Sequence, residues 1–572
     1  MASGMDTRLL FIPYRPISGT KKTPAGPGIS LQKHAAREYH RKAKLARLAR
    51  AYANSSSSHN VRDDPGTGFR RDRSGQGSRR QGAGVDDVST SHQKSSRDDD
   101  DDDEKNAFLM RTEDVAVTHR PPSPLDVVGV GQLDPFNVLI RRNVPHYVQE
   151  MLDHALSHQW PVFSCSVAAG AISEIKHTIL ESAMRSPAAF YTIVFAGATH
   201  NAFAHTGMPV TRENQVLRLT YKTHAIKALN REISSRMHAT TSVSDELLLC
   251  MVTLGFHGSG DTLMPRSQAT DDSPLLVAQN FHFYGHMDWE MAHFNAVKVM
   301  IRQRGGFHTI EQEFLSNVIA LADVIEAFKN LTAPTYPLRI TTARLMAIWP
   351  YPDPHSNTVP QALQLLATSF TNLPPPAAVQ LEDPLVQTIE TIRDVTIGYD
   401  LYMRKDPTAP RHIHVVWARN TLLHDLLRLP DRSWDDNPLI WDSCIYELCR
   451  LGTLAYMLLV LFPLPRVSGL HYTLARRIQH ALDSCLVFDL WERHAELLLW
   501  ATTLGGILAE ASTLRPWFCQ VAIKLCRELT LYSWTDIKGV CLTFLWYEQD
   551  CDKLGEDFWR ELNLGPWRNL VP

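Results

Sequence analysis

Apolar side chains recur at helical spacing along most of the chain after residue 140. Over 143–156 they follow the i, i+3, i+4, i+7 pattern that marks one face of an α-helix. Asn143 stands where it can cap the first turn, and Pro145 fits that turn because no backbone N–H is needed there. The pattern predicts a helix whose buried face carries Val144, Tyr147, Val148, Met151, Leu152, Ala155 and Leu156.

Two further helices are predicted on either side of a glycine pair. The first ends at Arg302–Arg304, where cations suit the negative end of the helix dipole, and Gly305 and Gly306 supply a left-handed cap. The second starts at once, with Thr309 and Gln312 as a predicted capping box. Its apolar face is expected to run until Pro334 and to consist of Phe314, Leu315, Val318, Ile319, Ala322 and Ile325.

Signals for β-strands are sparse. His412 to Trp417 is the best alternating candidate, and it is short. The most apolar stretch, Leu451 to Phe462, has 12 residues and stops at Pro463. A membrane-spanning helix needs roughly 20 residues, so this stretch is predicted to be a buried core helix and no membrane partner is expected. The predicted fold class is all-α, a large multi-helix domain.

Composition divides the chain into successive parts. A basic N-terminal segment precedes a stretch rich in Ser, Gly, Asp and Arg, which has too few apolar residues to fold and is predicted to be a disordered linker. The helical body follows, with a Pro-rich connection between its halves. The predicted parts are 1–53 (with a candidate helix over 31–53), the linker 54–120, the N-terminal half 121–349, the connection 350–378 and the C-terminal half 379–572.

The charge of the chain is strongly segregated. The 572 residues carry a formal net charge of only −3, with 44% hydrophobic and 21% charged residues, as in a globular chain. Lys33 to Arg50, however, contains seven basic residues and one acid, whereas Asp98 to Glu104 is an unbroken run of seven acids. This acidic run is interpreted as a solvated part of the linker, with binding to a basic partner as the alternative.

Cysteine usage indicates the compartment. All nine cysteines lie after residue 164, their number is odd, and no CxxC pair occurs. This is typical of reduced, packed thiols in an intracellular protein rather than of a disulfide framework.

The search for catalytic motifs is negative. The chain has no GxxxxGK[ST] loop, no HExxH, no GxSxG elbow and no GxGxxG after a strand. Gly255, Gly258 and Gly260 surround Ser259 in an order that fits neither glycine motif, so a surface loop is the better interpretation. No catalytic residue is assigned, no enzyme activity is predicted and no cofactor is expected.

One histidine cluster has spacing that suits a metal. On a continuous helix, His282, His286 and His293 would stand at i, i+4 and i+11, and the first pair has the spacing of helical zinc ligands. The apolar neighbours Trp289 and Phe294 instead indicate core packing. We therefore interpret these as core histidines, with a metal site as the weaker alternative.

The basic run is the other candidate site. On a helix, five of its cations fall within a stripe of roughly 120°, and they could contact DNA phosphates, act as a nuclear-import signal or form a solvated face. A basic-region zipper is excluded because no leucine heptad continues past Tyr52. The candidate residues for import or DNA contact are Lys33, Arg37, Arg41, Lys42, Lys44, Arg47 and Arg50.

Landmark residues recur in a characteristic order over about residues 5–560. They are His34–Arg41, Gly131, Asp134–Phe136, Trp289, His293, Arg304–Gly306, Asp323, Pro334, Arg419, His424, Leu426, Leu427, Glu447, Cys449, Arg450, Phe462–Pro465, Leu497–Trp500, Gly505, Gly506, Trp517, Phe518, Phe544–Trp546 and Trp559. In this order they resemble the fungal-specific transcription factor domain, the helical regulatory region that usually follows a six-cysteine binuclear zinc cluster. Six thiolates within about 30 residues are needed for that cluster, and here no Cys precedes Cys165.

The resemblance implies a nuclear transcriptional regulator whose helical domain engages other transcriptional proteins, with DNA as a partner through the basic segment and a homodimer as a further expectation. Two alternatives stay open. The first is a protein–protein or ligand-sensing regulatory module that does not bind DNA. The second is a metal-dependent enzyme that uses the three histidines.

Overall fold

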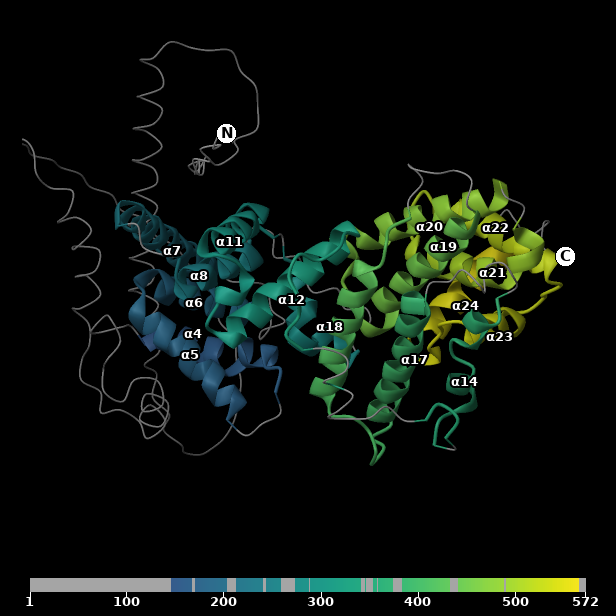
Figure 1. Cartoon of the computed structure of the whole chain (residues 1–572), viewed down its shortest axis with the longest axis horizontal. Helices are drawn as coiled ribbons and strands as arrows, with labels where there is room; N and C mark the ends of the chain where they lie inside the picture. Colours follow the sequence, from purple (N-terminus) through teal and green to yellow (C-terminus); the bar gives the residue numbers. More distant parts are fainter. Residues whose placement is uncertain are drawn as a thin grey trace, which may run out of the picture. The chain divides into compact units, whose positions relative to one another are not determined.

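The computed structural model describes residues 146–564, apart from gaps at 167–169, 203–211, 240–242, 259–272, 288, 341–344, 346–352, 357, 374–382, 433–440 and 488–489. Within these residues every regular element is a helix and no strand occurs, which confirms the all-α prediction (Figure 1). The basic helix predicted over 31–53, the linker 54–120, and the cap residues Asn143 and Pro145 lie outside the described residues.

The first group of helices surrounds α6, which is buried on all sides. Every residue of α6 from Ala188 to His200 is buried, and Ser186 caps the helix by accepting a hydrogen bond from the Ala189 N–H at 3.2 Å. The elements of this group, α6 among them, pack against α6 or against one another. They are α4 (His146–His154), η1 (Ala155–Gln159), η2 (Pro161–Phe163), α5 (Ala171–Arg185), α6 (Pro187–His200), α7 (Arg212–Ala239), α8 (Asp245–His257), α9 (Pro274–Val277), η4 (Ala278–Asn280), α10 (Phe281–Tyr284), α11 (Met291–Arg304) and η5 (Phe307–Thr309).

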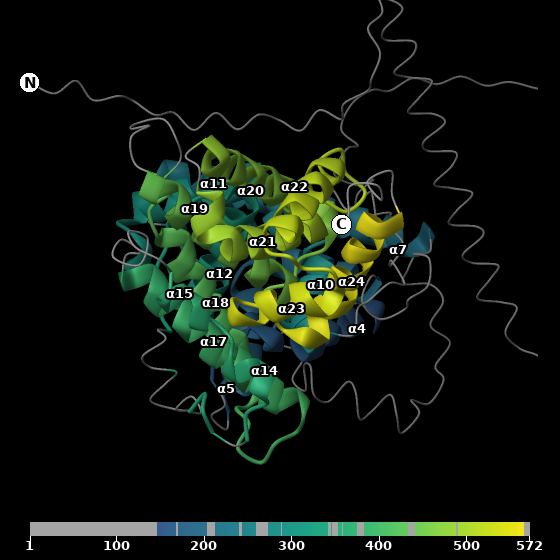
Figure 2. The ribbon, with the colours of Figure 1, turned by 90° about the vertical axis from the view of Figure 1, so that its right-hand side faces the viewer.

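The second group is built around α21, which Figure 2 shows among its neighbours. Gly505 and Gly506 lie where α21 meets α22 and α24, and a Cβ on either residue would collide with the ring of Phe518 or Phe558. Glycine is therefore required for this close approach. The elements are α14 (Gln361–Gln364), α15 (Thr368–Thr371), α17 (Asp383–Met403), α19 (Trp441–Tyr456), η6 (Met457–Leu461), η7 (Arg466–Ser468), α20 (Leu470–Val487), α21 (Trp491–Leu508), α22 (Arg515–Glu528), α23 (Trp534–Thr543) and α24 (Glu548–Leu564).

Two central helices, α12 (Glu313–Asn330) and α18 (His412–Arg428), pack against each other between the two groups (Figure 1). The strand candidate His412 to Trp417 is wrong, because these residues form the first turns of α18. Six alternating residues are too short a signal, and the apolar positions that continue to Leu427 at helical spacing decide the structure.

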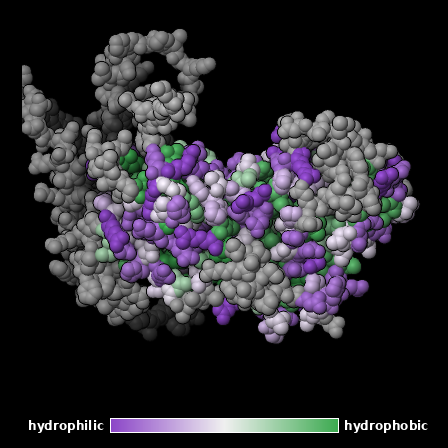
Figure 3. All heavy atoms as spheres, viewed as in Figure 1, coloured by the Kyte–Doolittle hydropathy of each residue, from purple (hydrophilic) through white to green (hydrophobic). Residues whose placement is uncertain are grey.

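Several predicted helices are confirmed. The helix predicted over 143–156 is α4, followed by the π-helical turn η1. The glycine cap after Arg304 is also present, with Gly305 in the left-handed region at φ 106°. Leu451 to Phe462 lies in α19 and η6 and is almost wholly buried. The helical window Cys444–Leu461 is long and apolar enough to cross a membrane, but 89% of it is buried inside the protein, as in a core helix. Figure 3 shows mainly hydrophilic residues, with smaller hydrophobic areas, on the visible surface of the described residues.

Arg419 of α18 is a fully buried cation that joins its own helix to two other backbone segments. Its Nη1 donates to the carbonyl oxygens of Leu275 and Leu461, and its Nη2 donates to that of Ala278 at 3.4 Å. The guanidinium carbon lies 4.4 Å from the centre of the Phe281 ring. Burial lowers the pKa of this arginine to about 9, so it remains charged at neutral pH. Among the described residues no carboxylate pairs with it, and carbonyl dipoles and aromatic faces stabilise the charge instead.

We expect Arg419→Met to lower the free energy of unfolding by about 3 kcal/mol or more, because the buried carbonyls would lose their donors. Urea denaturation followed by circular dichroism measures this. Arg428→Met is the matched control, since Arg428 is exposed on the same helix and should tolerate the change. Equal stability of the two variants would contradict the role given to Arg419.

Candidate functional site

Of the predicted site residues, only the three histidines are described, and they do not form a metal-binding group. The seven cations of the basic run lie outside the described residues. The continuous helix assumed for His282, His286 and His293 is wrong, because α10 ends at Tyr284 and α11 begins only at Met291. Asp288, between them, is also outside the described residues.

The break in this helix has a structural cause. Gly285 packs so closely against Pro465 that a Cβ there would collide with its ring. The Trp289 indole N–H donates to the Tyr284 carbonyl at 3.0 Å, and the Glu290 N–H donates to the Gly255 carbonyl at 3.0 Å. These contacts fix Gly285, Trp289 and Glu290 between α10 and α11, so the helical spacing in the sequence does not become a shared face.

The three histidines make contacts of different kinds. The Nδ1 of His286 donates to the His282 carbonyl at 2.7 Å, whereas the Nε2 of His293 lies 3.0 Å from Oε2 of Glu290. In the part of the chain that the structure describes, no group of three or more His, Cys, Asp or Glu residues is placed to hold a metal ion. The geometry on which a three-histidine site depended is therefore not present.

Glu290 is the centre of a small ion-pair cluster. Its Oε1 lies 2.6 Å from Nζ of Lys222, which also donates to the Gly258 carbonyl. The hydrogen bond with His293, together with Lys222, lowers the pKa of Glu290 to about 2. This cluster links α7, the end of α8 and the start of α11, so it connects three helices through one carboxylate.

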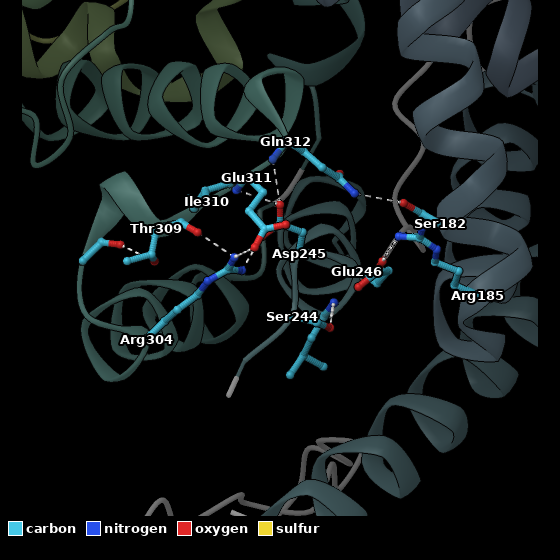
Figure 4. A network of polar contacts seen from close by, with 12 residues as sticks. Ser182, Arg185, Ser244, Asp245, Glu246, Arg304, Thr309, Ile310, Glu311 and Gln312 are labelled. Carbon is cyan, nitrogen blue, oxygen red and sulfur yellow. Dashed lines mark hydrogen bonds and ion pairs between the residues drawn. The ribbon is translucent and has the colours of Figure 1, made fainter. Parts of the chain in front are cut away.

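A second carboxylate, Asp245, organises the turn between α11 and α12 (Figure 4). Its Oδ1 pairs with Arg304, the last residue of α11. Its Oδ2 accepts hydrogen bonds from the N–H groups of Glu311 and Gln312 at 3.0 and 2.8 Å. Arg304 in turn donates to the Thr309 carbonyl at 2.6 Å. Asp245 is only 7% exposed, so these bonds form away from bulk water.

The capping box predicted from Thr309 and Gln312 is wrong. Helix α12 starts at Glu313, and the hydroxyl of Thr309 donates to the Gly306 carbonyl at 2.7 Å instead. Two of the donors next to the helix start are satisfied by Asp245, which is 67 residues away from Gln312 in the chain. The sequence around Asp245 signals only its own helix, α8, which Ser244 caps.

A buried group of histidines lies between α4, α6 and α8. The Nε2 of His154 is 2.8 Å from the Nδ1 of His200. The Nδ1 of His257 is 2.7 Å from the Thr253 carbonyl, which can only accept, so this nitrogen carries the proton. The Nε2 of His257 then accepts from the Gln159 amide at 3.0 Å. Burial lowers the pKa of His200 and His257 to about 4 each.

A buried ion pair joins neighbouring turns of α19. Arg450 binds the Glu447 carboxylate through two hydrogen bonds, of 2.9 and 2.7 Å. Asp431 lies 3.5 Å from Arg450 and also pairs with Arg477 at 2.7 Å, which ties α19 to α20. Desolvation by burial raises the pKa of Glu447 despite this arginine, as expected for a buried pair.

These clusters hold helix ends and helix faces together. Asp323 of α12 serves in the same way, because it accepts the N–H of Tyr336 at 2.9 Å and fixes the chain after that helix. The Tyr336 carbonyl contacts His424 of α18 at 3.2 Å. Asp323, His424, Glu447 and Arg450 are all landmarks of the resemblance, and their contacts give each of them a structural reason.

The comparison with protein families decides what this domain is. Residues 150–568 match the family model described as the fungal specific transcription factor domain. The chain belongs to this family. No curated protein and no solved structure matches the chain. The matched span covers well over half of the sequence and nearly all of the described helices. A regulatory domain of fungal transcription factors implies transcriptional regulation, and the family is typically not enzymatic.

We expect Asp245→Ala to lower the free energy of unfolding by about 2–4 kcal/mol, because it removes two caps and leaves Arg304 without its carboxylate. Chemical denaturation measures the loss. Glu246→Ala is the control, since among the described residues Glu246 forms an ion pair with Arg185, at 3.8 Å, and none with Arg304. The interpretation fails if the neighbouring variant loses as much stability as Asp245→Ala.

Stability should also fall with acid. The folded pKa values of His200 and His257 are about 4, below the ordinary value of 6.5, so the unfolded chain binds more protons between these limits. Above pH 6.5 these two histidines do not lower the free energy of unfolding. As the pH falls towards 4 they lower it, by about 2 kcal/mol per histidine at pH 5. The melting temperature should fall less between pH 7.5 and pH 5 for His257→Gln than for wild type. His480→Gln, at an exposed position, should behave like wild type; a wild-type difference in His257→Gln would refute this assignment.

Proposed function

We propose that the protein is a nuclear transcriptional regulator in which the helical domain is the regulatory scaffold and the basic N-terminal segment provides nuclear import or DNA phosphate contacts. The observation that carries this proposal is the family match over residues 150–568. The structure of the helical domain is consistent with a scaffold, because the polar clusters described above stabilise contacts between helices rather than forming a reaction centre.

The role of the basic segment is supported by its charge pattern. Seven cations and one acid within Lys33–Arg50 would place several positive charges along one side of a helix. Each cation that neutralises a DNA phosphate releases counterions, so binding through this segment would weaken steeply as salt rises. Import receptors recognise similar basic runs, and both functions fit a regulator without an N-terminal zinc cluster among its residues.

DNA binding is tested by fluorescence anisotropy of the full-length protein on duplex DNA across a salt series. In the test variant the seven cations Lys33, Arg37, Arg41, Lys42, Lys44, Arg47 and Arg50 are changed to Gln. The matched control changes seven arginines of the linker, Arg62, Arg70, Arg71, Arg73, Arg79, Arg80 and Arg97. We expect the test variant to lose binding, and the control to retain a log–log salt slope of about −5 to −6, as for six phosphate contacts.

Localisation of fluorescent fusions provides the second readout. The test variant should lose nuclear accumulation if the segment acts in import, whereas the control should accumulate as wild type does. Thermal melts followed by circular dichroism should show the same unfolding transition in all three proteins, since the helical domain does not contain the altered residues. Unchanged DNA binding together with unchanged localisation in the test variant would contradict the role proposed for the segment. A protein that never binds DNA but enters the nucleus would act through partner proteins.

A further inference from the structure

The long helix α7 covers one side of the first helix group (Figure 1). Its 28 residues span about 42 Å. The inner face packs on α6, with Ala225 and Leu229 buried and the Nε of Arg218 donating to Oγ1 of Thr199 at 3.1 Å. Lys222 is used by the ion pair with Glu290. The inner side of α7 therefore packs inside the protein and is not available to a partner.

The outer face of α7 is different in character. Its exposed side chains fall within an arc of about 200° on the helix. Two of them are large apolar residues one turn apart, Val216 and Leu219, which are 42% and 49% exposed. This face includes three cations and no acid among its described side chains. Its members are Arg212, Gln215, Val216, Leu219, Thr220, Thr223, Lys227, Asn230, Arg231, Ser234 and Ser235.

The charges of this face are not neutralised within the described residues. Arg212, Lys227 and Arg231 form no ion pair there, in contrast to Lys222 on the inner side. Lys227 and Arg231 are one turn apart, and the centre of this pair is within about 20 Å of the apolar pair along the helix axis. The outer face thus carries the apolar pair Val216 and Leu219 near its first residue, Arg212, and the two cations Lys227 and Arg231 further along the helix.

We propose that the outer face of α7 is a docking surface for an acidic peptide segment of a partner protein that also carries apolar side chains. Carboxylates of the segment pair with Lys227 and Arg231, while its Leu or Phe side chains cover Val216 and Leu219. Charge complementarity selects an acidic ligand. The exposed apolar pair favours a peptide over DNA, because a phosphate backbone would leave these two side chains in water. This inference goes beyond the proposed function, since it requires neither DNA binding nor a nuclear address.

The test uses the full chain and a fluorescein-labelled 16-residue peptide in which Asp and Glu alternate with Leu and Phe. A second peptide has Ser in place of every Leu and Phe, and a 20-base-pair DNA duplex serves as another polyanion. Anisotropy at two salt concentrations measures binding of each. We expect the apolar-bearing peptide to bind at least about tenfold more tightly than the Ser peptide, since burial of the apolar pair is part of the contact.

Variants on the surface locate the site. Lys227→Glu combined with Arg231→Glu should weaken binding of the apolar-bearing peptide by about tenfold or more. Leu219→Ser should also weaken this binding, without changing its salt dependence. The matched control reverses two exposed cations elsewhere, Arg476→Glu with Lys553→Glu, and should bind as wild type does. All altered side chains are exposed, and equal melting temperatures will verify that each variant is folded.

Four outcomes would overturn the proposal. The first is equal binding of the two peptides, and the second is equal weakening by the control charge reversal. A third is tighter binding of the peptide by a chain whose acidic run Asp98–Glu104 is changed to Asn and Gln, because this run would then be what occupies the outer face of α7. A fourth is a dimer in light scattering that dissociates when Lys227 and Arg231 are reversed, because the face would then bind a second copy.

Discussion

A buried guanidinium that pairs with no carboxylate among the described residues joins α18 to one segment that precedes it in the sequence and one that follows it. Arg419 can remain charged inside the protein only if carbonyl oxygens surround it, and these come from Leu275, Ala278 and Leu461, which lie far from it in the sequence. The backbone adapts to this requirement. Gln279 and Asn280 adopt left-handed φ values of 56° and 57°, which non-glycine residues rarely do. The Gln279 side chain accepts a hydrogen bond from Asn420, the residue next to the arginine, at 3.1 Å.

The same physical principle recurs at both ends of α12. Backbone N–H groups next to a helix terminus have no partner in the helix itself, and here buried carboxylates accept hydrogen bonds from them. Asp245 serves the start of α12, and Asp323 serves the chain that follows its end. Because charged residues inside the domain are occupied in this way, recognition of other molecules is left to the surface. The outer face of α7, with exposed cations and apolar residues, has the composition for such a role.

Periodicity predicted most of the helical structure, because each amphipathic helix must bury one face and its sequence records which one. The stop after Arg304 was equally clear, since glycine after a cationic last turn has a local meaning. Local rules failed where a distant residue decided the outcome. Thr309 and Gln312 looked like a capping box, but Asp245 does the capping. The helix assumed through His282 and His293 is broken by contacts with Pro465 and Gly255, which no local pattern reveals.

Hydrogen exchange of the Arg419→Met protein, followed by mass spectrometry, tests most directly whether one buried cation couples the central segments. The account predicts that amides in 275–284 and 457–462 exchange faster together in this variant, while α7 and α22 keep their wild-type rates. These two segments contain the carbonyl oxygens and rings that contact the guanidinium, although nearly two hundred residues separate them. Faster exchange confined to α18 itself would contradict the account, because it would show that the arginine stabilises only its own helix.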